Sequence, residues 1–137
     1  MTNHIYFNFS GGKEKITDHE LWLASSKVAD MDQGLIIQEF VDVPTYLDYQ
    51  EPTKLSKNIF HPNLMNHRSG GMDHPFLLNH RDYSKPCASL YDPKTKRKMT
   101  MATIKERIIQ RLNKGFKFHI PLDAHWQTHE RAFRDCG

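Results

Sequence analysis

The chain has 137 residues, enough for one domain of ordinary size but not for two. Its hydrophobic fraction of 38% and charged fraction of 26% are typical of a globular protein. No window approaches the roughly 20 apolar residues that span a bilayer, and no N-terminal stretch resembles a signal peptide. Cys87 and Cys136 lie far apart and match no metal or redox spacing, so we expect a cytoplasmic protein with no membrane partner.

The net charge of +3 is unevenly distributed along the chain. Residues 1–68 carry six Lys/Arg against nine Asp/Glu, whereas residues 69–137 carry thirteen against seven. The run from Lys94 to Lys117 has nine basic residues and a single acid, Glu106. Such a run can bind nucleic acid, but no recognised nucleic-acid motif accompanies it. We therefore favour a solvated basic face and expect no nucleic-acid partner.

The first element expected is a strand over residues 4–9, "HIYFNF". Polar and aromatic residues alternate with apolar ones there, with His4, Tyr6 and Asn8 on one face. The apolar face suits a core and the polar face suits the lining of a cleft. The following "SGGK" ends the strand.

Further strands are expected over residues 19–25, 35–43 and 74–80. The strand over 35–43 is mostly apolar, which predicts that it is buried. Prolines within residues 43–59 exclude a helix and favour an extended or edge segment. A hairpin is expected from residues 88–91 and 98–101, because Asp-Pro opens a turn between them.

Residues 103–115 carry the pattern of a helix. Thr103 and Glu106 have the spacing of a capping box, and Gly115 stands where a C-terminal cap is expected. Apolar residues in between fall on one helical face. We therefore expect a largely β chain with one helix in its C-terminal tail, and no internal repeat.

Five segments of the chain, taken in order, resemble the aldose 1-epimerase (galactose mutarotase) family. The segments are "TNHIYFNFSGG", "ITDHELWLASSKVADMDQGLI", "VDVPTYLDYQEPTKLSKNI", "GGMDHPFLLN" and "SLYDPKTKRKMTM". Each is weak alone, but the ordered set is specific and covers roughly residues 2–101. The resemblance implies part of a supersandwich of antiparallel strands over residues 1–101. It also implies an isomerase that interconverts the α and β anomers of hexoses such as glucose or galactose, with no cofactor.

Mutarotation requires a base at the anomeric hydroxyl and an acid at the ring oxygen. By resemblance, His4 is the general acid, and Asp73 and Asn3 bind the sugar. Without the resemblance, an exposed terminal histidine is the favoured interpretation of His4, and a turn residue is the ordinary interpretation of Asp73. Met72 stands where the family usually has tyrosine, which makes the sugar preference less defined.

Several parts of the family pattern are absent from the sequence. The late Leu-Glu-Thr-Gln segment with the catalytic base does not occur, and the upstream sugar-binding segment would precede Met1. We therefore expect a truncated member whose residues 102–137 are a divergent, partly helical tail, for example from a shifted reading frame. An inactive, carbohydrate-binding or interaction remnant is the alternative. Exposed strand edges of such a fragment favour a homodimer.

A metal site is the weakest reading of the histidines. His125 and His129 are four residues apart, which a helix would place on one face, but the spacing matches no standard zinc site. We expect no metal.

Overall fold

The computed structural model describes residues 2–11, 13–32, 34, 36–66, 72–103, 107–112, 116–121 and 125–129. It gives only the backbone for residues 2–6 and for the strands beyond residue 103. In the described residues the secondary structure is mainly antiparallel strand, as the sequence predicts. No helix among the described residues is long and apolar enough to cross a membrane.

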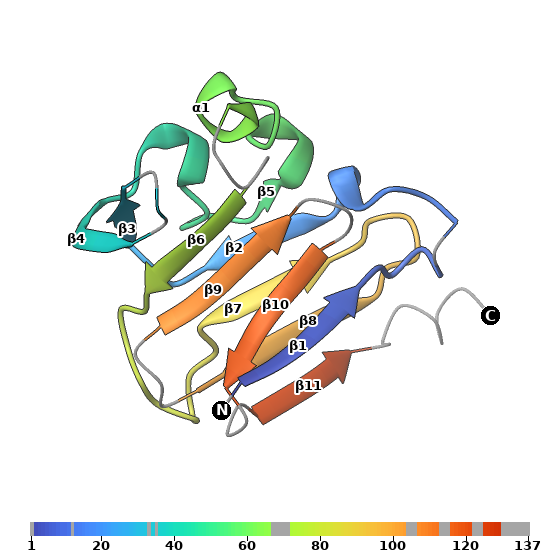
Figure 1. Ribbon diagram of the computed structural model, residues 1–137. Coiled ribbons are helices and arrows are strands. Elements are labelled where there is room, and N and C mark those ends of the chain that lie inside the picture. The colour runs from blue at the N-terminus through green and yellow to red at the C-terminus, as the bar shows by residue number, and fades with distance from the viewer. Residues whose placement is uncertain are drawn as a thin grey trace.

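The strands form two sheets that lie one in front of the other (Figure 1). The front sheet has six strands, in the order β1 (Thr2–Phe7), β10 (Phe116–Pro121), β9 (Arg107–Leu112), β6 (Met72–Leu77), β3 (Lys27–Met31) and β4 (Ile37–Asp42). The five-stranded sheet has the order β11 (His125–His129), β8 (Lys98–Ala102), β7 (Ala88–Tyr91), β2 (Glu20–Leu23) and β5 (Thr53–Lys54). Short helical turns lie between the strands: η1 (Ile16–Asp18), η2 (Thr45–Leu47), η3 (Leu55–Lys57) and the one-turn α1 (Pro62–Met65).

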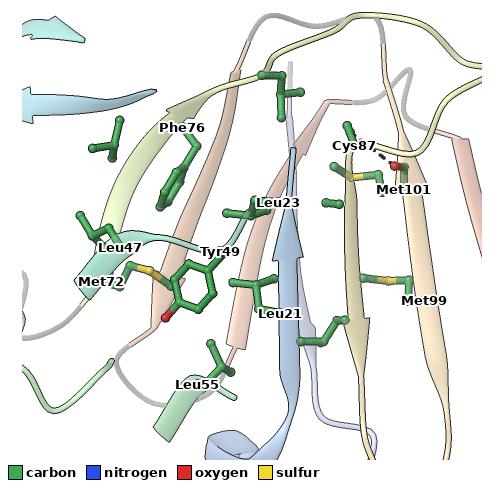
Figure 2. Packing of buried hydrophobic residues seen from close by; sticks show 14 of the residues in the cluster. Leu21, Leu23, Leu47, Tyr49, Leu55, Met72, Phe76, Cys87, Met99 and Met101 are labelled. Atoms are coloured by element: carbon green, nitrogen blue, oxygen red, sulfur yellow. Dashed lines mark hydrogen bonds between the residues drawn. The ribbon is translucent and has the colours of Figure 1, made fainter. Parts of the chain in front are cut away.

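The core fills the space between the sheets (Figure 2). Leu21 and Leu23 of β2 are buried, and they belong to one cluster with Met72 and Phe76 of β6. Tyr49 reaches this cluster from the segment after η2 and is 1% exposed. The proline-containing segment, residues 43–59, holds the two 3-10 turns η2 and η3 and the short strand β5 but no α-helix, and it also contributes to the core.

The predicted hairpin is confirmed. β7 and β8 pair with Ala88 opposite Met101 and Tyr91 opposite Lys98. The strands expected near residues 4–9, 19–25 and 74–80 appear as β1, β2 and β6, with boundaries displaced by up to a few residues.

Two expectations about the middle strands are corrected. β3 was not expected from the sequence. β4 is not buried, because it is an edge strand whose only partner among the described strands is β3, and none of its residues is buried. The prediction that this strand is buried rested on its apolar composition alone, and that composition did not distinguish an edge strand from an interior one.

The helix expected over residues 103–115 is wrong for residues 107–112, which form β9. β9 pairs with β6 over six rows and with β10 over four, so both of its edges are used. A helix of this length is only marginally stable alone, whereas the strand gains two ladders of backbone hydrogen bonds. The adjacent isoleucines also suit a strand. β9 and β10 thus lie inside the front sheet, between β6 and β1, and β11 is an outer strand of the five-stranded sheet.

Candidate active site

The register of the front sheet fixes where His4 lies relative to the other polar residues. In β1, His4 is opposite His119 of β10, and Tyr6 is opposite Lys117. Directly opposed residues of antiparallel strands belong to the same face of a sheet. His4, Tyr6, Lys117 and His119 therefore occupy one face.

Pairing across β10, β9 and β6 relates this face to Asp73 on β6. Lys117 is opposite Arg111 of β9, and Arg111 is opposite Asp73. Asp73 thus belongs to the face that carries His4 and Tyr6. His4 and Asp73, two of the three residues that the resemblance singles out, are 69 positions apart in sequence, yet the sheet gathers them on one side.

The other face of this sheet faces the core. Met72 and Phe76 alternate with Asp73 along β6 and are each 1% exposed. Asp73 itself is only partly buried. Its backbone N–H donates to Nδ1 of His74, at 3.1 Å, and His74 lies on the core side. The alternation along β6 therefore separates an apolar packing face from a polar face.

Spacing across the sheet sets the size of the candidate site. β10 and β9 lie between β1 and β6 (Figure 1). Three strand intervals of about 4.8 Å separate the backbones of β1 and β6 by roughly 14 Å. This span admits a hexose together with the side chains that would hold it.

Asn3 is not brought to this face. It pairs with Ile120, and alternation assigns it to the side opposite His4. Asn8 follows β1, and its side chain folds the next turn: its Oδ1 accepts from the Ser10 N–H at 3.0 Å, and its Nδ2 donates to the Glu14 carbonyl at 2.8 Å. Asn8 therefore organises a loop and does not line a cleft. Gly70 and Gly71, which precede Asp73 in sequence, lie outside the described residues.

The end of β1 is anchored to the body of the protein by His19. The Phe9 N–H donates to Nε2 of His19 at 3.1 Å, and the two rings stack with centroids 5.6 Å apart. Burial lowers the pKa of His19, although the carboxylates of Asp92 and Asp18 act in the opposite direction. Neutral His19 thus accepts a backbone hydrogen bond just beyond β1, which fixes where the strand ends.

Four polar residues on the candidate face were not identified from the sequence as members of a site: Arg107, Arg111, Lys117 and His119. "FKFHIP" alternates apolar residues with Lys117 and His119, a period-two signal over six residues. That signal could have indicated the β10 strand and its polar face. Arg111 gave no such signal, because its segment also fits a helical period.

A separate pocket of about 400 Å³ lies over η2, β5 and η3 and includes neither His4 nor Asp73. One wall is the Tyr46 ring stacked on His61, with centroids 4.4 Å apart and planes 13° from parallel. Nδ1 of His61 accepts the N–H of Asn63 at 3.1 Å, which fixes the ring. Polar side chains complete the lining, among them Asp48, Gln50, Lys57 and Asn58.

Metal ligation finds no support in the part of the chain with described side chains, where no group of three His, Cys, Asp or Glu residues could hold an ion. His125 and His129 lie on β11, a strand, and not on a helix. Four residues along a strand separate their backbones by about 13 Å. The helical spacing that suggested a joint site therefore does not apply.

Comparison with known proteins assigns the chain to a family. The family model described as aldose 1-epimerase matches residues 1–109, most of the chain. The chain belongs to the aldose 1-epimerase family. The match continues past residue 101, where the quoted motifs end.

Solved structures of similar fold agree with this membership. A galactose 1-epimerase from Lactobacillus acidophilus superposes with a TM-score of 0.72 at 16% identity, over 93% of this chain and 48% of that one. A GalM/aldose epimerase homologue from C. elegans gives 0.66 at 15% identity, over 91% of this chain and 40% of that one. These likenesses show a galactose mutarotase-like fold. The chain spans less than half the length of either structure, and no curated protein sequence matches it.

Proposed function

We propose that the chain acts as an aldose 1-epimerase on hexoses such as glucose or galactose. The observation that carries the proposal is the register of the front sheet, which gathers His4 and Asp73 on its polar face. Family membership supplies the type of reaction. We assign no cofactor, since ring opening and closure need only proton transfer. The cytoplasm is the proposed compartment.

The roles follow from the chemistry of the two side chains. Histidine exchanges protons near neutral pH, so His4 suits protonation of the ring oxygen. The Asp73 carboxylate accepts hydrogen bonds from sugar hydroxyls and so orients the ring. Asn3 is retained as a sugar-binding candidate from sequence resemblance, although it lies on the opposite face of β1.

Polarimetry of freshly dissolved α-glucose and α-galactose tests the proposal. We expect the protein to accelerate the approach to anomeric equilibrium, and His4→Gln to lower kcat by about 10²- to 10⁴-fold. Asp73→Asn should raise KM more than it lowers kcat. His80→Gln is the matched control, because His80 lies on the loop between β6 and β7 and contacts the Pro86 carbonyl.

A wild-type rate equal to that of buffer would overturn catalysis by this chain. That the chain is truncated and inactive is a separate prediction, which a wild-type rate equal to that of buffer would support. Asn3→Ala should leave both constants unchanged if only the polar face binds sugar, and raise KM if Asn3 contributes.

The second candidate is a carbohydrate-binding protein without catalysis, and the pocket over η2, β5 and η3 favours it. Pockets of 300–1,000 Å³ accommodate small ligands, and its aromatic wall and amide and carboxylate groups suit a sugar. Titration of labelled protein with glucose and galactose by NMR distinguishes the two. Shifts confined to Tyr46, Gln50 and Asn58 with no catalysis would favour this candidate, whereas shifts on β1 and β6 favour the epimerase.

A further inference from the structure

We propose that His119 is the second proton-transfer group of the site and works as a general base with His4. This inference rests on the proposed epimerase function. It comes from one juxtaposition: β1 and β10 are paired so that His4 and His119 are directly opposite. Their Cα atoms are therefore roughly 5 Å apart, and the two residues share the face that carries Asp73.

The proton balance of the reaction requires a base close to the acid His4. Opening the ring removes a proton from the anomeric O1 and adds one to the ring oxygen O5, and both oxygens are bonded to C1. Acid and base must therefore lie close together. Two residues on neighbouring strands at one row meet this requirement, whereas Asp73 lies three strands from His4.

The complete step balances in protons and electrons. Neutral His119 takes the O1 proton, the electron pair of that O–H bond forms the C1 carbonyl, and the C1–O5 bond breaks. O5 takes the proton of the His4 imidazolium, which leaves His4 neutral and His119 protonated. After rotation about C1–C2, closure on the other face returns the O5 proton to His4, and O1 takes the proton from His119.

Electrostatics within the face favours one proton shared by the pair. Two imidazolium ions at opposed positions repel, so protonation of one disfavours protonation of the other. The titratable and charged residues at neighbouring positions of this face come from each paired strand. They are Tyr6 on β1, Lys117 on β10, Arg107 and Arg111 on β9, and Asp73 on β6.

The face therefore carries three cationic residues, Lys117, Arg107 and Arg111, and one carboxylate, Asp73, which is directly opposite Arg111. A singly protonated pair contains one acid and one base. This is the state from which ring opening can start.

The test compares His119→Gln and His119→Ala with wild type, His4→Gln and the control His80→Gln. We expect both His119 variants to lose about 10²- to 10⁴-fold in kcat with KM changed little. One limb of the bell-shaped pH–rate profile should disappear in His119→Gln. Added imidazole should restore part of the rate to His119→Ala and none to His119→Gln, because only the smaller side chain leaves room for it.

The outcomes separate the role of His119 from the proposed function. Full activity of His119→Gln beside an inactive His4→Gln would overturn the role of His119 and leave the proposed function standing. A loss of activity without imidazole rescue, and with both limbs of the pH profile retained, would make His119 structural and also overturn it. Wild type no faster than buffer would overturn both. Far-UV circular dichroism and the thermal midpoint of each variant identify any that fails to fold.

Discussion

The Cys87 thiol is buried directly before β7 and donates to the Met101 carbonyl at 3.4 Å (Figure 2). Burial raises its pKa to about 11, so the reactive thiolate is scarce near neutral pH. In a Cys136→Ser background, we expect the single thiol to resist a disulfide reagent at about pH 8 in the folded protein. It should react fully in concentrated denaturant. Rapid reaction of the native protein would contradict the burial.

His19 makes folding depend on pH. Its pKa is lowered from 6.5 by burial, so the folded state binds fewer protons than the unfolded state as the pH falls below 6.5. Its contribution to the free energy of unfolding is therefore complete above pH 6.5 and is lost as the pH falls toward the folded pKa.

Urea midpoints at about pH 7.5 and about pH 5.5 measure this dependence. Wild type should lose more stability between the two than His19→Gln, which cannot be protonated. Equal losses in both proteins would show that His19 does not stay neutral in the fold.

At the scale of secondary-structure elements, the turn of the β7–β8 hairpin is stabilised by hydrogen bonds to one buried carboxylate. Asp92 is 2% exposed and accepts from the Lys94 N–H at 3.0 Å and from the Thr95 hydroxyl at 2.8 Å. Burial acts to raise its pKa, but these hydrogen bonds prevail and lower it. Lys96 completes the turn with a φ of 60°, in the left-handed region.

Two substitutions test this turn, one expected to lower the free energy of unfolding and one expected to raise it. Asp92→Ala should lower the free energy of unfolding by about 1–3 kcal/mol, because the Lys94 N–H and the Thr95 hydroxyl both lose their acceptor. Lys96→Gly should raise it by up to about 1 kcal/mol, since the left-handed conformation costs glycine nothing. Urea denaturation measures both, with Asp92→Asn as the conservative control. A stabilised Asp92→Ala would contradict the account.

The elements also show what sequence reasoning can and cannot reach. The β7–β8 hairpin was predictable because Asp92 and Pro93 determine it locally. β9 was not, because its segment satisfies a helical period and becomes a strand only between β6 and β10, which are distant in sequence. Tertiary pairing thus outweighed a local preference.

The same distinction applies to the candidate site. His4 and Asp73 could be named from motifs in the sequence, but their common face depends on the register across four strands. His119 could not be linked to His4, because nothing local relates β1 to β10. The divergent origin of residues 102–137 stays a prediction, and translation of the neighbouring DNA in other frames tests it.

For the whole molecule, stability should depend on contact between the sheets. Leu21 is 0% exposed and belongs to the cluster that joins β2 to β6. Leu21→Ala should cost about 2.7–5 kcal/mol, a large part of the 5–15 kcal/mol that holds a typical domain together. Met65 is 53% exposed, so Met65→Ala should change stability by less than about 0.5 kcal/mol. Urea unfolding of both variants makes the comparison, and equal losses would contradict this core.

The two outer strands of the front sheet, β1 and β4, each pair on one side only among the described strands. Such edges can pair with another copy of the chain. Ile36, directly before β4, adds an exposed apolar side chain to one of them. The Lys27–Asp42 ion pair at 2.6 Å joins β3 to β4 but is solvent-exposed, so it offers little protection against association. We therefore predict a homodimer through the β4 edge.

Light scattering coupled to size-exclusion chromatography, over a range of protein concentrations, tests this prediction. Ile36→Lys places a charge at the β4 edge and should shift the protein toward monomer. Met65→Lys is the matched control, because Met65 is 53% exposed but lies on α1, in neither sheet. If Met65→Lys dissociates the dimer as strongly, association depends on general surface apolarity and not on the edge. A wild-type protein that is monomeric at every concentration would exclude pairing through β4, and the mass of the complex is the deciding measurement.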